Sequence, residues 1–178
     1  FSGVNLSYAN LTGANLAGTD LRWSNLSGTN LQYTDLSNAR LFESDLTNAN
    51  LTGADLKGVK SGKIIGNVSG LVYPWMLLSG YLIGPNADLE GADLAGVNLT
   101  GADLNSTILT GAYLSGANLT NTNLSNAVLN WADLTGAVFT NSNLYYAELA
   151  HADFTGATVL NAIFTSTVWD QTRWTDGE

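Results

Sequence analysis

Large apolar residues recur every five positions along this chain of 178 residues. Leucine occupies eleven consecutive steps from Leu6 to Leu56, and after an interruption eighteen further steps run from Leu89 to Trp174. Two positions before each of these residues stands Ala, Thr, Ser or Val, and nothing larger. A five-residue period fits neither an α-helix, at 3.6, nor a plain β-strand, at 2. We interpret the large and the small residue of each repeat as an inward-pointing pair that packs a core.

The polar positions of the repeat predict corners. Asn or Asp directly precedes the leucine in ten of the eleven repeats from Leu6 to Leu56, and such side chains bond readily to nearby backbone. Glycine often stands two positions after the leucine, as at Gly13 and Gly101, which is a further turn signal. Each repeat is therefore a short extended piece plus a corner. Stacked repeats predict a solenoid around a continuous leucine column.

Several repeats resemble the A(D/N)LXX consensus of the pentapeptide-repeat family, and the resemblance covers about residues 4–60 and 87–174. The matching segments are ANLTG, ADLKG, ADLEG, ADLAG, ADLTG and ADFTG. The resemblance implies an all-β fold, a right-handed quadrilateral β-helix with four pentapeptides to a coil and about seven to nine coils. The two interrupted arrays, with GYLIGPNADL leading into the second, resemble cyanobacterial members of the family.

The repeat loses its register between the two arrays. We predict a first array at 1–60, an irregular joint or loop at 61–88, and a second array with a C-terminal cap at 89–178. All three are expected to form one continuous β-helical domain.

The joint contains both prolines and much apolar sequence, with Trp75, Met76 and Tyr81 as its candidate contact residues. Residues 81–83 are predicted to be extended. The apolar content favours a packed joint that covers part of the core, and the alternative is a projecting loop that binds a partner.

Composition limits the partners and the compartment. Six Lys and Arg against 15 Asp and Glu give a net charge of −9, which disfavours direct binding of nucleic acid. The longest apolar stretch, residues 71–83, is shorter than the roughly 18 residues that span a bilayer, so no membrane insertion is expected. We expect a periplasmic or thylakoid-lumen location if a signal peptide has been removed, and otherwise a cytoplasmic one.

Candidate chemistry is scarce, and we predict no catalytic residue, cofactor or metal site, so the protein is not expected to be an enzyme. The only histidine is His151, which excludes multi-histidine metal sites, and the chain has no cysteine. Asp35 with Asp55, and Asp133 with Asp153, lie twenty residues apart and should stack. Stacked carboxylates can bind a cation, but carboxylates bonded to their own backbone are the favoured interpretation.

The second array departs from the consensus before its large residues, and this departure predicts a contact surface. Apolar residues there share a twenty-residue column, and aromatic residues occupy the adjoining corner and face. The alternative is that β-branched residues simply suit strand positions. The candidates are Ile108, Val128, Trp131, His151, Tyr145 and Tyr146. Trp169 and Trp174 are candidates for an end cap or for self-association.

Two functions are compatible with these residues. The first is a non-catalytic structural or interaction module for an unknown protein partner, as a monomer or an end-to-end dimer. The alternative is an acidic DNA mimic that binds a type II topoisomerase (gyrase), as quinolone-resistance pentapeptide proteins do. The acids are expected to be spread over several faces without a continuous acidic stripe, which disfavours the alternative.

Overall fold

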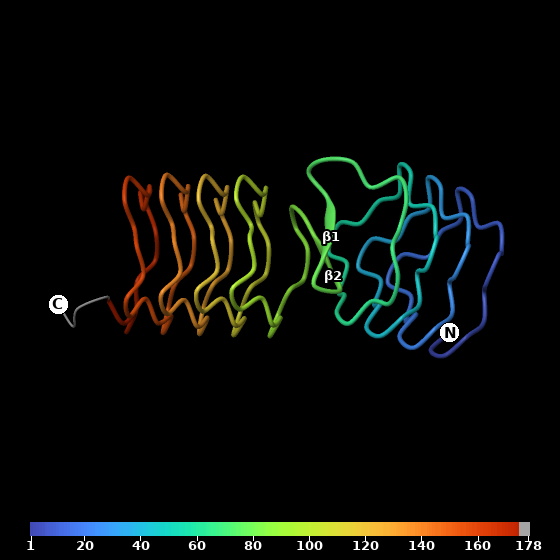
Figure 1. Cartoon of the computed structure of the whole chain (residues 1–178), viewed down its shortest axis with the longest axis horizontal. Coiled ribbons are helices and arrows are strands. Elements are labelled where there is room, and N and C mark those ends of the chain that lie inside the picture. Colours follow the sequence, from blue (N-terminus) through green and yellow to red (C-terminus); the bar gives the residue numbers. More distant parts are fainter. Residues whose placement is uncertain (175–178) are drawn as a thin grey trace. The chain divides into compact units, whose positions relative to one another are not determined.

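The computed structural model describes residues 1–174 and divides the chain into two compact units, Phe1–Ile83 and Gly84–Glu178, here called unit 1 and unit 2. Figure 1 shows each unit as a stack of similar coils, unit 1 from blue to green and unit 2 from green to red. The boundary assigns residues 84–88 to unit 2. Whether the units form one continuous helix remains a prediction.

The coil has four sides. Parallel bridges join residues twenty apart, such as Asn5 to Asn25 in unit 1 and Ile108 to Val128 in unit 2, so each turn of the solenoid takes four pentapeptides. The predicted quadrilateral β-helix is therefore confirmed. Each side of the coil contains only one residue that bridges to the neighbouring coil, because the next turn begins directly after it.

The corners explain the polar part of the repeat. The leucine carbonyl accepts a hydrogen bond from the N–H three residues on, as from Ala9 to Leu6 at 3.0 Å. The third residue of this turn has a positive φ, +67° at Gly13, as a type II turn requires. The Asx side chain bonds the same turn, since Asn5 Oδ1 accepts the N–H of Ser7 at 3.0 Å.

The leucines form a column inside each unit. Leu31 and Leu119 are fully buried, as are small residues two positions before a leucine, such as Thr34 and Ala117. Where the small residue is Thr its hydroxyl is satisfied: Thr34 Oγ1 donates to the Leu11 carbonyl at 2.9 Å. Within residues 1–174, no buried side-chain nitrogen or oxygen lacks a hydrogen-bond partner.

The joint begins where unit 1 loses one residue from its coil. Asn50 bridges to Ser69, nineteen residues on instead of twenty. The chain then forms an antiparallel hairpin of strands β1 (Met76–Leu78) and β2 (Tyr81–Ile83). The predicted extended piece at residues 81–83 is thus confirmed. Within residues 1–174, no helix is long and apolar enough to cross a membrane.

Candidate functional site

The twenty-residue register assembles a column of mostly apolar side chains on one side of unit 2. Bridges join Ile108 to Val128, Val128 to Glu148 and Glu148 to Val168. Ile108 is 40% and Val168 54% exposed, whereas Val128 is half-buried. The column therefore forms an exposed apolar strip interrupted by one carboxylate.

Aromatic residues lie at the corners on both sides of this strip. Tyr145 and Tyr146 belong to the corner before it, with ring centroids 4.3 Å apart in an edge-on arrangement. Their hydrogen bond raises the pKa of Tyr145. Trp131 and His151 occupy the corner after it and stack with centroids 3.8 Å apart. We call the strip and its two aromatic corners the partner face. The six residues predicted as a contact surface therefore lie on one face and its edges.

Three of these aromatic residues have a left-handed backbone. The φ angles are +64° at Trp131, +56° at Tyr146 and +61° at His151. At this corner position glycine or asparagine adopts the conformation most cheaply, whereas a bulky residue there is uncommon. The fold alone therefore does not favour aromatic residues at these positions.

Polar contacts join the two coils at the Trp131–His151 corner. Asn130 Nδ2 donates to Glu148 Oε2 at 2.9 Å. Its Oδ1 accepts the N–H of Ala150 at 2.8 Å. Asn130, next to Trp131 in the chain, thus ties two successive coils together.

The stacked carboxylates are bonded to their own turns, as favoured from the sequence. Asp133 and Asp153 lie on neighbouring coils. They accept the N–H of Thr135 at 3.0 Å and of Thr155 at 2.9 Å. The hydroxyl of Thr155, with help from Arg173, lowers the pKa of Asp153. No group of three possible ligands from His, Cys, Asp or Glu occurs in the described part of the chain.

The acids of unit 2 gather on one edge, which the sequence reasoning missed. Seven of its eight described acids lie at the Trp131–His151 corner or on the two faces that meet there, and only Asp103 lies elsewhere. The acids of unit 2 lie on three faces, in keeping with the expected spread, but their concentration around one corner was not predicted. Sorting the acids by their place in a twenty-residue coil would have found the cluster. This acidic edge consists of Asp88, Glu90, Asp93, Asp133, Glu148, Asp153 and Asp170.

The family profile described as pentapeptide repeats matches the chain in eight copies, over residues 1–22, 19–58, 86–121 and 122–159. The chain belongs to the pentapeptide-repeat family. Its fold is accordingly the right-handed form of the quadrilateral β-helix. A search of curated protein sequences finds no match.

Solved structures of pentapeptide-repeat proteins show similar folds. HetL, involved in heterocyst differentiation regulation in the cyanobacterium Nostoc sp., is 26% identical with a TM-score of 0.54, covering 100% of this chain and 92% of HetL. A thylakoid-lumen protein of Arabidopsis thaliana is 31% identical, with a TM-score of 0.44, over 45% of this chain and 56% of its own. A trypsin-treated variant of QnrB1, a plasmid-mediated fluoroquinolone resistance protein, is 19% identical, with a TM-score of 0.38, over 96% and 84%. Of these three likenesses, the one to HetL is close enough to support the fold.

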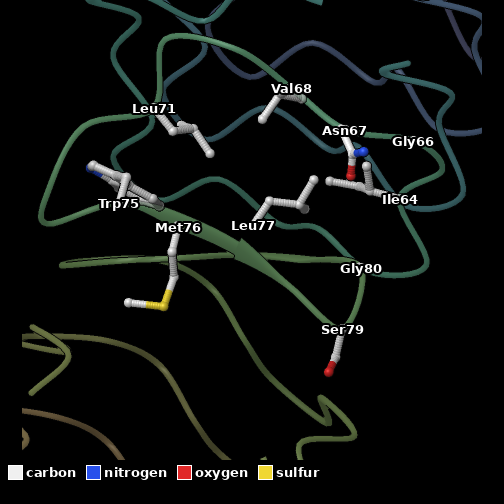
Figure 2. A pocket seen from close by; sticks show the side chains of 10 residues that line it. All are labelled: Ile64, Gly66, Asn67, Val68, Leu71, Trp75, Met76, Leu77, Ser79 and Gly80. Carbon is white, nitrogen blue, oxygen red and sulfur yellow. The ribbon is translucent and has the colours of Figure 1, made fainter. Parts of the chain in front are cut away.

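The joint residues of this pentapeptide-repeat protein separate into two places. Trp75 and Met76 line a cavity of about 540 Å³ in unit 1. Leu71, Val68 and Leu77 point into it in Figure 2. Tyr81 instead lies against Gly62, beside the ring of Phe42. Val72 and Tyr73 are 71% and 76% exposed, so the joint combines a packed hairpin with an exposed segment.

The predicted end-cap residues pack together in the last described coil. The rings of Trp169 and Trp174 lie 4.8 Å apart. They lie 6.0 and 5.1 Å from Phe154. The aromatic rings therefore continue the leucine column to residue 174. The rest of the predicted C-terminal cap, residues 175–178, lies outside the described residues.

Proposed function

We propose that this pentapeptide-repeat protein is a non-catalytic interaction module that binds a protein partner through the partner face of unit 2. The observation that carries the proposal is that aromatic residues at left-handed corners, Trp131, Tyr146 and His151, flank one mostly apolar strip. Tyr8, Trp23 and Tyr33 of unit 1 have the same backbone conformation, so the strip between the corners distinguishes unit 2. Backbone strain that the fold does not require supports a role outside the fold.

The energies favour this interpretation over simple packing. A left-handed backbone costs a bulky residue about 1–2 kcal/mol relative to a right-handed one. The Trp131–His151 stack returns about 0.5–1.5 kcal/mol. The two terms nearly cancel, so the stack contributes little to stability, whereas an exposed aromatic pair suits a contact surface.

The same face has the composition of an interface. Its central column holds Ile108, Val128 and Val168, with the carboxylate of Glu148 between the last two, and its edges are aromatic. Interface cores are enriched in aromatic residues and surrounded by polar rims. The only histidine of the chain is committed to the stack with Trp131, which supports a binding role over catalysis.

Capture of a partner from a native extract tests the proposal with two matched variants. The first carries Val128→Asp and Trp131→Asp on the partner face. The control carries Val138→Asp and Asn141→Asp, which place two aspartates at the equivalent positions two sides further round the coil. A partner held by the wild type and the control but lost by the first variant supports the proposal. Equal capture by all three, or by none, contradicts it.

Imitation of DNA is the second candidate, and the acidic edge is the observation that favours it. The edge carries seven acids and Arg173, a net charge of −6. From Asp88 to Val168 there are four coil spacings, about 20 Å at 4.8 Å each, or one net charge per about 3 Å. Duplex DNA carries one per about 1.7 Å, roughly twice as dense. A gyrase supercoiling assay tests this candidate, and an unchanged rate at micromolar protein contradicts it.

A further inference from the structure

The two units divide the charge of the chain unequally. Unit 1 contains five acids and five basic residues and has no net charge. Unit 2 contains ten acids and one arginine, a net charge of −9. Five of the six positive charges therefore belong to unit 1.

All five basic residues of unit 1 lie on one face of its coils and at the two adjoining corners. Arg40 and Lys60 are bridged neighbours on that face. Lys57 lies at the corner before it, and Arg22 and Lys63 lie at the corner after it. With Asp20 and Glu43, which share the face, the net charge is +3. We call this set of residues the basic face.

Aromatic side chains, one exposed and one half-buried, accompany the positive charges. The Arg22 guanidinium lies 4.9 Å from the ring centre of Trp23, and the Lys63 ammonium lies 5.4 Å from that of Phe42. Trp23 is 53% exposed and donates from Nε1 to Glu43 at 3.1 Å. Glu43 also pairs with Lys63 at 3.4 Å. At this corner the rings of Trp23 and Phe42 are therefore held in place by charged side chains, and these charged side chains remain in contact with solvent.

Arg22 and Arg40 differ in whether they form an ion pair. Arg22 pairs with both carboxylate oxygens of Asp20, at 2.8 and 2.6 Å. Arg40 is exposed and has no ion-pair partner among residues 1–174. Arg40 is bridged on one neighbouring coil to Asp20, whose pKa its charge helps to lower, and on the other to Lys60.

We propose that the basic face of unit 1 binds the acidic edge of unit 2 in a second copy of this chain. The two surfaces carry +3 and −6, and each combines charges with exposed aromatic residues at a coil corner. Opposite potentials steer encounter and fix the register of partners. The acidic edge shares Glu148 and the Trp131–His151 corner with the partner face, so the two proposed ligands would occupy overlapping surfaces. The dependence on salt and on charge reversal in the purified protein tests this proposal separately from capture of a partner.

The expected association is weak and sensitive to salt. Exposed charges are screened over about 10 Å at 0.1 M salt and about 3 Å at 1 M. Sedimentation equilibrium of the full chain should show an average mass above the monomer at 25 mM salt, which falls to the monomer mass near 1 M. A monomer mass at 25 mM salt up to the highest soluble concentration overturns the proposal.

Two variants of equal net charge test the face. Arg40→Gln with Lys60→Gln removes two positive charges from the basic face. The control, Asn30→Asp with Asn50→Asp, adds two negative charges two sides away and retains the oxygens that accept the N–H groups of Gln32 and Thr52. The first variant should weaken association about tenfold, while the control stays near the wild type. Equal weakening in both shows a general charge effect and overturns the proposal.

A mixing experiment identifies the second surface. Arg40→Glu with Lys60→Glu makes the basic face acidic, and Glu148→Lys with Asp170→Lys makes part of the acidic edge basic. The first variant alone should be monomeric at 25 mM salt, because its altered face changes from +3 to −1 and repels the acidic edge. The second variant alone should associate more weakly than the wild type, because its acidic edge falls from −6 to −2. Mixed together they should associate, because one supplies an intact basic face and the other an intact acidic edge. If the mixture stays monomeric while both melt as the wild type does, the pairing is wrong.

Discussion

Unit 1 and unit 2 wind the same twenty-residue coil around the same leucine column, but they differ in almost everything outside it. Unit 1 holds five of the six basic residues, and unit 2 holds ten of the fifteen acids. Inside, Leu31 of unit 1 and Leu119 of unit 2 are equally buried. Packing therefore fixes two positions of each repeat, and the remaining positions can vary with the surface that each unit presents.

The corners show a second difference. In unit 1 several corner glycines lie against a neighbouring coil, as Gly70 lies against Thr52. In unit 2 most corner glycines are open, as at Gly101, where an added Cβ would meet nothing within 4 Å. In the irregular coil of the joint, glycine is needed both for its positive φ and because a Cβ would clash with the neighbouring coil. In the regular coils of unit 2 it is needed for its positive φ alone.

The leucine column is expected to be the most sensitive feature. Replacing Leu119 with Lys places a charge in a fully buried position and should lower the free energy of unfolding by several kcal/mol. Leu160→Lys is the control, because Leu160 is 61% exposed, and it should change stability by less than about 0.5 kcal/mol. Urea denaturation of both variants measures the difference. Similar stabilities would contradict the inward assignment of the repeat.

The next largest effect separates the two kinds of corner. Gly101→Ala should cost about 1 kcal/mol, since only the positive φ of +70° opposes it. Gly70→Ala should cost about 3 kcal/mol or more, because its Cβ would lie 2.5 Å from the backbone nitrogen of Thr52. Thermal and urea denaturation give both values. A Gly70→Ala variant no less stable than Gly101→Ala would show that the joint can move to make room.

Much of the fold was predictable because it repeats. Every leucine step enforces the same inward pair, so a five-residue period identifies the β-helix and the register that brings Val128 beside Ile108. The joint was less predictable, because Asn50 pairs with Ser69 across one missing residue and the chain then forms a hairpin. Nothing periodic marks either feature.

The residues of the candidate site could be predicted from the sequence, but the contacts between their side chains could not. The column and its corners follow from the register, whereas the stacking of His151 on Trp131 depends on side-chain directions that the sequence does not encode simply. The acidic edge shows the opposite case. Its residues are visible in the sequence, but they form an edge only after the coil has placed Glu148 beside Asp133 and Asp153 around one corner.

A smaller effect on stability distinguishes surface aromatics from structural ones. Trp131→Asn removes the stack with His151, worth about 0.5–1.5 kcal/mol, and relieves a left-handed backbone that costs about 1–2 kcal/mol. The two effects should cancel, so the free energy of unfolding should stay within about 1 kcal/mol of the wild type. A loss above about 2 kcal/mol in urea denaturation would make Trp131 a structural residue, and the main support for the partner face would be lost.

The smallest expected effect compares one corner carboxylate in each unit. Two hydrogen bonds from Arg22 hold the pKa of Asp20 well below its usual range. In unit 2 the Thr155 hydroxyl lowers the pKa of Asp153, with a further contribution from Arg173 at 3.1 Å. A carboxyl whose pKa is lowered on folding stabilises the protein above its unfolded pKa of about 3.9, and this stabilisation is lost as the pH falls through the folded pKa.

Melting temperatures measured from pH 7 to pH 2 for the wild type, Asp20→Asn and Asp153→Asn test this comparison. Asparagine retains the acceptor for the turn and removes the charge, so each variant should approach the wild type as the pH falls below about 4. The change with pH should be larger for Asp20→Asn, because Arg22 engages both of its carboxylate oxygens, whereas Arg173 reaches Asp153 through one contact. In an Arg22→Gln background the pH dependence of the Asp20→Asn difference should nearly disappear. If it persists, the turn itself and not the arginine lowers the pKa of Asp20, and the corners of the two units are then electrostatically alike.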